Sequence, residues 1–335
     1  MPERADLIAR FLAANGWGDA ERRKLAGDAS FRRYDRLTRG GERAVLMDAP
    51  PPMEDVRPFA RLARHLAGLG YSAPRVLAED AAAGLLLLED LGNDTYTRML
   101  ASGGDEQALY ELAVDLLADL HGRPAAEAVP AGLAPYDAER LLTEALLLTD
   151  WFMPAALGRD TDAACRDAYV AAWREAMAPV LQAPPVLVLR DFHVDNLMWL
   201  RDRTGLAACG LLDFQDALAG HAAYDLMSLV EDARRDIEPA FHADMLARYL
   251  AAFPGIDEAL FRRDFAILAA QRHAKVIGIF TRLWRRDAKP DYLVHIPRVW
   301  RLLERALAEP ALAPVAGWLQ TYLAPEHRRR PDNKE

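Results

Sequence analysis

The chain has 335 residues, a formal charge of −9 and two cysteines, and hydrophobic residues make up 52% of it. This composition is typical of a globular protein, and a net acidic chain repels nucleic-acid backbones and anionic membranes, so non-specific binding to either is not expected. The cysteines have no partners at metal-ligand spacing, and neither a signal peptide nor a membrane span is evident. We therefore expect a cytoplasmic protein that binds neither nucleic acid nor membrane, and a monomer.

The first 92 residues predict a small lobe built on an antiparallel sheet. Apolar residues at helical spacing and short runs between turn residues predict the elements in chain order. They are a helix at 4–14, strands at 22–25, 31–37 and 43–47, a helix at 59–69, and strands at 75–79 and 85–88. Residues 89–92 follow the last strand and are a plausible hinge.

From residue 93 onward helical patterns dominate, with one β-rich segment at 186–213. The predicted helices are 105–121, 137–152, 162–181, 223–234, 238–253, 257–285, 291–308 and 311–324. The prediction is an α+β chain in two lobes. Residues 1–92 form a small antiparallel sheet with one helix, 59–69, between its strands and the short helix 4–14 before them, and residues 93–325 form a larger helical lobe. Residues 326–335 form a polar tail.

The β-rich segment carries the residues that suit phosphoryl transfer. One stretch is Leu-Arg-Asp-Phe-His-Val-Asp-Asn at 189–196, and the other is Asp-Phe-Gln-Asp at 213–216. Arg190-Asp191, four residues and Asn196, followed by Asp213-Phe214, reproduce the protein-kinase pattern of a catalytic carboxylate and two oxygen ligands for Mg²⁺. The pattern predicts Mg²⁺ and ATP as cofactors.

On these residues the chain resembles the aminoglycoside phosphotransferase and choline kinase superfamily, whose members have a two-lobed protein-kinase-like fold. Further stretches resemble its bacterial anomeric kinases for N-acetylmuramic acid and N-acetylglucosamine. These stretches are 27–34, 47–51, 213–217, 224–226 and 271–278. The resemblance implies an ATP- and Mg²⁺-dependent kinase that phosphorylates the anomeric hydroxyl of these sugars in cell-wall recycling.

The resemblance also implies roles for individual residues. Asp191 would be the catalytic base or orienting carboxylate, Asn196 and Asp213 would hold Mg²⁺, and Asp225 would have a structural role near the catalytic loop. The nucleotide would contact two segments. They are the turn Ser30, Phe31, Arg32 and Arg33, and the hinge residues Glu89, Asp90 and Leu91.

Three positions depart from the family pattern. Leu189 replaces a supporting histidine, and Gln215 replaces the glycine of Asp-Phe-Gly, which suggests a loop less able to flip. The strand at 43–47 lacks the kinase lysine, so Arg32 or Arg33 is our hypothesis for the cation at the α- and β-phosphates.

The candidate acceptor contacts are Arg190, His193, Arg272 and Lys275. Arg272 and Lys275 are three residues apart on a predicted helix, so they share a face that could meet the carboxylate of N-acetylmuramic acid. A solvated helix face is the more common explanation of such a cluster. His193 is expected to hydrogen-bond the loop backbone, and Asp225 to cap the helix that follows.

Three other functions remain open. A phosphotransferase for an aminoglycoside, choline or homoserine would use the same fold. A pseudokinase binding module would lack a magnesium ligand. A metal-dependent hydrolase would use Asp191, His193, Asp195 and Asp213 and would need a transition metal.

Overall fold

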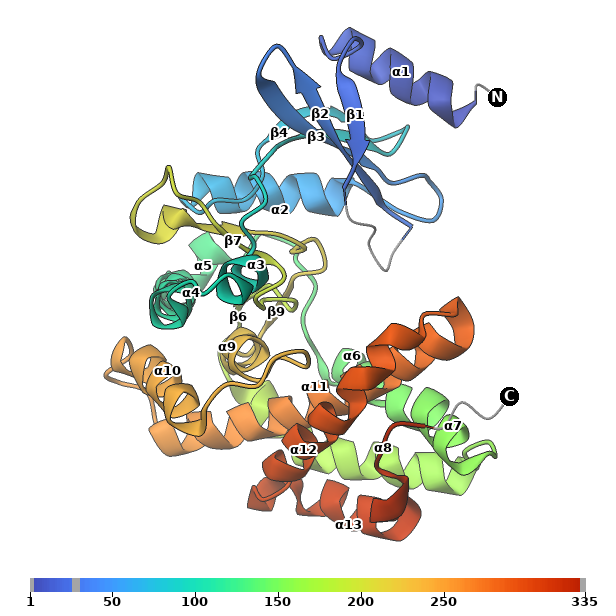
Figure 1. The fold of residues 1–335 in the computed structure, drawn as a ribbon. Coiled ribbons are helices and arrows are strands. Elements are labelled where there is room, and N and C mark those ends of the chain that lie inside the picture. Colours follow the sequence, from blue (N-terminus) through green and yellow to red (C-terminus); the bar gives the residue numbers. More distant parts are fainter. Residues whose placement is uncertain (1–2, 26–30, 332–335) are drawn as a thin grey trace. The chain divides into compact units, whose positions relative to one another are not determined.

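The computed structural model describes residues 3–25 and 31–331, and these divide into two compact units (Figure 1). The first unit is Met1–Leu116 with Val194–Ala217, and the second is Leu117–His193 with Leu218–Glu335. The sequence predicted a different division, into functional lobes that meet between residues 92 and 93, and that division stays a prediction. Within the described residues, no helix is both long and apolar enough to cross a bilayer.

The first unit is built on a five-stranded antiparallel sheet in the order β1-β2-β3-β5-β4. Its strands are β1 (Glu21–Lys24), β2 (Arg33–Arg39), β3 (Glu42–Asp48), β4 (Val76–Asp80) and β5 (Leu85–Glu89). The remaining elements are α1 (Arg4–Ala14), α2 (Arg57–Gly68), α3 (Tyr96–Ala101), most of α4 (Glu106–Gly122), β7 (Leu197–Trp199), the 3₁₀ turn η3 (Gly205–Ala208) and β8 (Cys209–Leu211). The predicted order of three strands, a helix and two strands is confirmed.

Both faces of this sheet are covered. Side chains of a strand alternate between faces, and β5 is nevertheless buried at every position from Leu85 to Leu88. Leu85 and Leu87 share a core with Phe11 of α1, and α2 lies on the other side of the sheet (Figure 1). Two helical layers therefore explain why β5 reads as a continuous apolar run rather than an alternating one.

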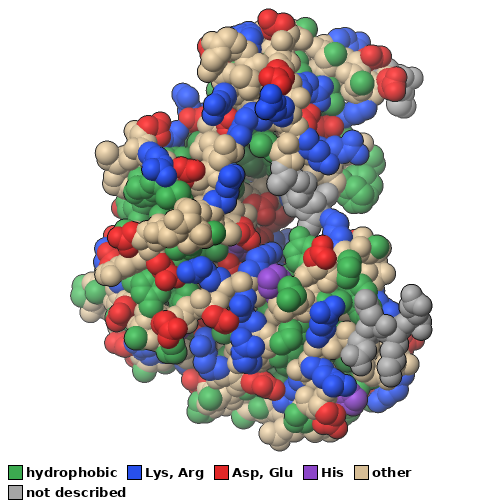
Figure 2. Space-filling model, viewed as in Figure 1, with side chains coloured by type: hydrophobic (Ala, Val, Ile, Leu, Met, Phe, Trp, Pro, Cys, Tyr) green, Lys and Arg blue, Asp and Glu red, His purple; other side chains and the backbone are tan. Residues whose placement is uncertain are grey.

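The surface charges of the first unit are largely paired. Arg22 bonds Asp35 at 2.6 Å, and Arg39 bonds Glu42 at 2.7 Å. Figure 2 shows basic and acidic side chains interspersed on the visible face of the molecule. Exposed pairs of this kind contribute little to stability.

The second unit is mainly helical. Its helices are α5 (Ala125–Ala128), α6 (Ala138–Ala145), α7 (Met153–Leu157), α8 (Ala163–Met177), α9 (Ala223–Val230), α10 (Pro239–Ala251), α11 (Glu258–Asp287), α12 (Ile296–Ala306) and α13 (Ala313–Tyr322). Its short segments are the π-helical η1 (Leu148–Phe152), the 3₁₀ turns η2 (Val180–Gln182), η4 (Pro290–His295), η5 (Pro310–Leu312) and η6 (Pro325–His327), and the paired strands β6 (Val186–Val188) and β9 (Leu218–Gly220).

Helix α11 is the central element of the second unit and packs against α6, α9 and α12 (Figure 1). Every residue from Ile267 to Gly278 is buried. A helix that is covered all round must bury its polar side chains as well, and these then require partners inside the protein.

The predicted helix 137–152 is interrupted where it meets α11. It consists of α6, which ends at Ala145, and the π-helical turn Leu148–Phe152. A Cβ atom placed on Gly278 of α11 would lie 2.3 Å from the carbonyl carbon of Leu147 and 2.4 Å from its oxygen. The backbones therefore approach as closely as only glycine allows, and this fixes the end of α6 against α11.

Gly278→Ala is therefore expected to lower the free energy of unfolding by about 1–3 kcal/mol, because the new methyl group meets backbone that cannot move aside. Urea denaturation of the two proteins would measure the difference. Gly317→Ala is a matched control, because Gly317 is also helical and a Cβ atom there meets nothing within 4 Å. An equal effect of the two substitutions would contradict the close-contact explanation.

Candidate functional site

In the second unit, the residues before Asp191 are held by α9. Strand β6 ends at Val188, and the carboxylate of Asp225 then accepts hydrogen bonds from the backbone N–H groups of Leu189 at 2.6 Å and Arg190 at 2.8 Å. Arg190 has φ of +71°, which is unfavourable for a residue with a Cβ atom. Such a conformation persists only where the surroundings hold it, and the two bonds to Asp225 do so.

Asp225 does not cap helix α9, contrary to the local sequence prediction. It lies in the first turn, is fully buried, and binds the backbone of a segment more than thirty residues earlier in the chain. The contacts of Asp225 support the role that the resemblance implied, which is a structural one beside the Asp191 loop. Burial raises the pKa of its carboxyl group to about 7, although both backbone bonds act to lower it.

Asp191 itself lies close to a buried arginine. Its Oδ1 atom is 3.8 Å from Nη2 of Arg272, and 37% of the Asp191 side chain is exposed. Burial acts to raise the pKa of Asp191, but the charges of Lys275 and Arg272 outweigh it, and the pKa is lowered overall. Asp191 is therefore a carboxylate at neutral pH.

The solvated-face explanation is wrong for Arg272 and Lys275 of α11. They are only 6% and 7% exposed. Arg272 donates to Oγ of Ser228 at 2.7 Å, and its Nε atom has no hydrogen-bond partner among the residues that the structure describes. Because α11 is covered all round from Ile267 to Gly278, Arg272 and Lys275 face side chains of other segments instead of water.

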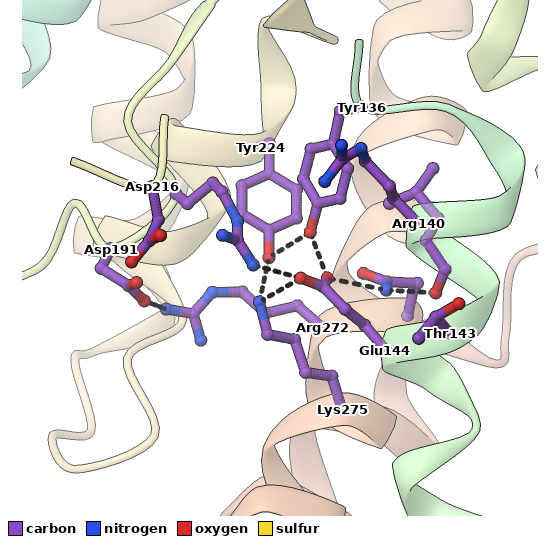
Figure 3. Close-up of polar contacts among 12 residues, drawn as sticks. Tyr136, Arg140, Thr143, Glu144, Asp191, Asp216, Tyr224, Arg272 and Lys275 are labelled. Carbon is purple, nitrogen blue, oxygen red and sulfur yellow. Dashed lines mark hydrogen bonds and ion pairs between the residues drawn. The ribbon is translucent and has the colours of Figure 1, made fainter. Parts of the chain in front are cut away.

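Glu144, which the sequence analysis did not identify, pairs with one cation of α11 and with Arg190, and Figure 3 shows it beside Lys275. It lies in the last turn of α6, forms ion pairs with Arg190 and with Lys275, the latter at 3.1 Å, and accepts a hydrogen bond from Tyr136. A signal for it exists, because a charged residue at 144 falls on the apolar helix face formed by Leu141, Ala145 and Leu148.

The remaining candidate of the second unit is His193, which is 6% exposed. Burial lowers the pKa of its imidazole, so the ring is neutral near pH 7. In residues 3–25 and 31–331 no three His, Cys, Asp or Glu side chains form a group that could hold a metal ion, as the hydrolase alternative would require.

In the first unit, Asn196 and Asp213 lie together. Asn196 directly precedes β7 and Asp213 follows the end of β8. Nδ2 of Asn196 is 3.5 Å from Oδ2 of Asp213. Gln215, which replaces the kinase glycine, donates to Oδ1 of Asp213 at 2.7 Å, and Phe214 is fully buried and stacks on Phe59. These contacts hold the Asp213 carboxylate in place.

The two arginines proposed to meet phosphate have different surroundings. Nη2 of Arg32 is 3.9 Å from Asp213, its Nε is 3.7 Å from Glu54, and only 12% of its side chain is exposed. Arg33 is exposed on β2. Phe31 is 62% exposed, and its N–H donates to Glu54 at 3.1 Å. Ser30 lies outside the described residues.

The hinge residues use their side chains within the first unit. Glu89 forms ion pairs with Arg75 and Arg203, and Asp90 forms one with Arg36 at 2.7 Å. The N–H of Glu89 bonds the carbonyl of Arg75. With their carboxylates engaged, Glu89 and Asp90 would have to meet a nucleotide through the backbone, and their role in binding it, with that of Leu91, stays a prediction.

The fold and these residues define a protein-kinase-like phosphotransferase. Residues 21–261 match the model of the phosphotransferase enzyme family, and the chain belongs to this family. It is 40% identical to the N-acetylmuramate/N-acetylglucosamine kinase of Caulobacter vibrioides, over 98% of this chain and 99% of that protein. It is also 40% identical to the protein of the same name from Pseudomonas aeruginosa, over 91% and 90% of the two chains.

Solved structures agree on the fold. An aminoglycoside 2'-phosphotransferase in complex with GDP has a TM-score of 0.60 and 16% identity, and the match covers 92% of this chain and 99% of that one. A choline/ethanolamine kinase family protein from Mesorhizobium loti has a TM-score of 0.61 and 15% identity, with 95% and 100% covered. The predicted fold class and the resemblance are confirmed.

The raised pKa of Asp225 predicts a stability that depends on pH. An Asp that titrates near 7 when folded and near 4 when unfolded binds more protons in the folded state between these values, so its contribution is full at low pH and is lost as pH rises through about 7. Wild type should lose on the order of 2–3 kcal/mol relative to Asp225→Asn between pH 5 and pH 8.

Urea denaturation of both proteins between pH 5 and pH 8 would measure their free energies of unfolding. The contributions of groups that titrate in both proteins cancel when one free energy is subtracted from the other. A difference between wild type and Asp225→Asn that stays constant with pH would show that Asp225 is ionised throughout.

Proposed function

We propose that the protein transfers the γ-phosphoryl group of ATP to the anomeric hydroxyl of N-acetylmuramic acid and of N-acetylglucosamine, giving the sugar 1-phosphates. The observation that carries the proposal is the 40% identity, over almost the whole of both chains, to a kinase named for these two sugars. The chain also keeps Asp191, Asn196 and Asp213, which a pseudokinase would be expected to lack in part.

In this proposal Asp191 accepts a hydrogen bond, and then the proton, from the attacking hydroxyl. Its lowered pKa supports this role, since only the ionised carboxylate can accept the proton of the hydroxyl. The basicity of Asp191 is low, so its main contribution is orientation of the hydroxyl, as is general for phosphoryl transfer.

Asn196 and Asp213 would hold Mg²⁺. The amide and carboxylate oxygens are the hard donors that this ion prefers, and the two side chains lie together in the first unit. When bound, Mg²⁺ supplies charge neutralisation on the phosphate oxygens. The contact from Gln215 keeps Asp213 in a fixed orientation for that purpose.

The charges beside Asp191 support an anionic or neutral acceptor over a cationic one. Arg190, Arg272 and Lys275 all lie in its surroundings, and Arg272 and Lys275 are buried. An aminoglycoside or choline would bring a further positive charge to these cations. An N-acetylated sugar brings none.

We further propose that the reaction takes place in the cytoplasm and serves the recycling of cell-wall sugars, with the protein acting as a monomer. Both Cys165 and Cys209 are free and buried, which suits a reducing compartment.

Phosphorus NMR of purified protein with Mg²⁺, ATP and either sugar tests this function. We expect a phosphate signal coupled to the anomeric proton of the sugar, and a decrease in kcat of about 10²–10⁴-fold in Asp191→Asn. Asp202→Asn, at an exposed turn, is the matched control and should retain activity. Intact ATP with both sugars would refute the acceptor assignment.

Arg32, rather than Arg33, should replace the missing strand lysine, because only Arg32 lies near Asp213. We expect Arg32→Ala to raise the KM for ATP by about tenfold or more, the typical cost of losing a charge-assisted hydrogen bond. Arg33→Ala is the matched comparison and should change this KM by less than about twofold.

Steady-state kinetics at saturating sugar would measure both KM values. A larger effect of Arg33→Ala than of Arg32→Ala would reverse the assignment.

A further inference from the structure

Glu144 is a buried carboxylate between two cations that belong to the acceptor side of the proposed site. Figure 3 shows it meeting Tyr136 and Lys275, with Arg272 and Asp191 beyond them. Only 15% of its side chain is exposed, compared with 19% for Arg190 and 9% for Lys275. Gln271 also donates to it at 3.4 Å. Glu144 is therefore held by four side chains from three segments.

In the free protein each of the three cations on the acceptor side therefore has a carboxylate neighbour. Glu144 pairs with both Arg190 and Lys275, and Asp191 lies 3.8 Å from Arg272. Burying an unpaired ammonium or guanidinium group is very unfavourable. Without Glu144, the two cations that it pairs would need a negative charge from elsewhere, and an acceptor carboxylate would supply it.

The two sugars of the proposed function differ in this charge. N-acetylmuramic acid carries a lactyl carboxylate, and N-acetylglucosamine is neutral. A site with unpaired cations would favour the first strongly, because the neutral sugar would leave those cations buried and without partners. A site whose cations are already paired can accept both.

We propose that Glu144 is a specificity-determining residue that acts as an internal counter-anion, occupying Arg190 and Lys275 so that a neutral acceptor is used as well as an anionic one. It acts through these two cations and is a positioning residue, not a catalytic one. Arg272, whose Nε atom lacks a hydrogen-bond partner among the described residues, is then the donor left for the acceptor carboxylate. The proposal rests on the proposed function.

The test compares N-acetylmuramic acid with its lactyl amide, which has the same shape and no charge. We expect wild type to use both, and Glu144→Gln to raise the ratio of kcat/KM for the acid over the amide by about tenfold or more. Glu139→Gln is the matched control, because Glu139 lies in the same helix, is exposed and pairs with Arg174. Its ratio should equal that of wild type.

A purely structural role of Glu144 would reduce both kcat/KM values equally, and an unchanged ratio would overturn the proposal. If Glu144→Gln does not fold, the double variant Glu144→Gln/Lys275→Met removes one charge of each sign and serves instead. Its ratio should stay near the wild-type value, and a ratio as high as that expected of the single variant would also overturn the proposal.

The two proposals fail in different measurements. If wild type phosphorylates neither sugar, the proposed function is wrong, and the role proposed for Glu144 is wrong as well. If wild type phosphorylates both and Glu144→Gln leaves the ratio unchanged, only the role of Glu144 is wrong.

Discussion

The second unit depends on one buried interaction, the two hydrogen bonds that Asp225 accepts from the backbone of Leu189 and Arg190. Both N–H groups lie beyond the end of β6 at Val188, where Arg190 turns into the left-handed region. A buried donor without a partner costs about 1–3 kcal/mol, so the carboxylate of α9 is what allows this turn. This turn determines the position from which the Arg190 side chain reaches Glu144, and it also determines the position of the next residue, Asp191.

Much of the fold follows from periodicity. The helix at 4–14 was predictable because its apolar residues recur at helical spacing, and the strands of the first sheet because short runs lie between turn residues. The interruption of 137–152 was not, because it arises from the contact of Leu147 with Gly278, about 130 positions away. Strand β9 was not predicted for a similar reason. Three residues are too few to show a strand pattern, and they form a strand here because they pair with β6.

The candidate site was predictable where it depends on residue spacing and not where it depends on tertiary contacts. Asp191, Asn196 and Asp213 stand in a recognisable pattern, although their roles remain proposals. The burial of Lys275 could not be inferred from α11 alone, because its partner Glu144 belongs to a helix that the sequence gives no reason to place beside it. The choice of Arg32 over Arg33 likewise rests on Asp213, which lies far along the chain.

The strand that leads to Asp191 has a further consequence for local stability. β6 and β9 are three residues each and form a ribbon of two strands, which is too short to be stable alone. The Asp191 loop therefore takes its order from the packing of α9 and α11 behind it. Partial loosening of those two helices would disorder the loop before the chain unfolds globally, so the segment that carries Asp191 belongs to the same cooperative unit as the helical core.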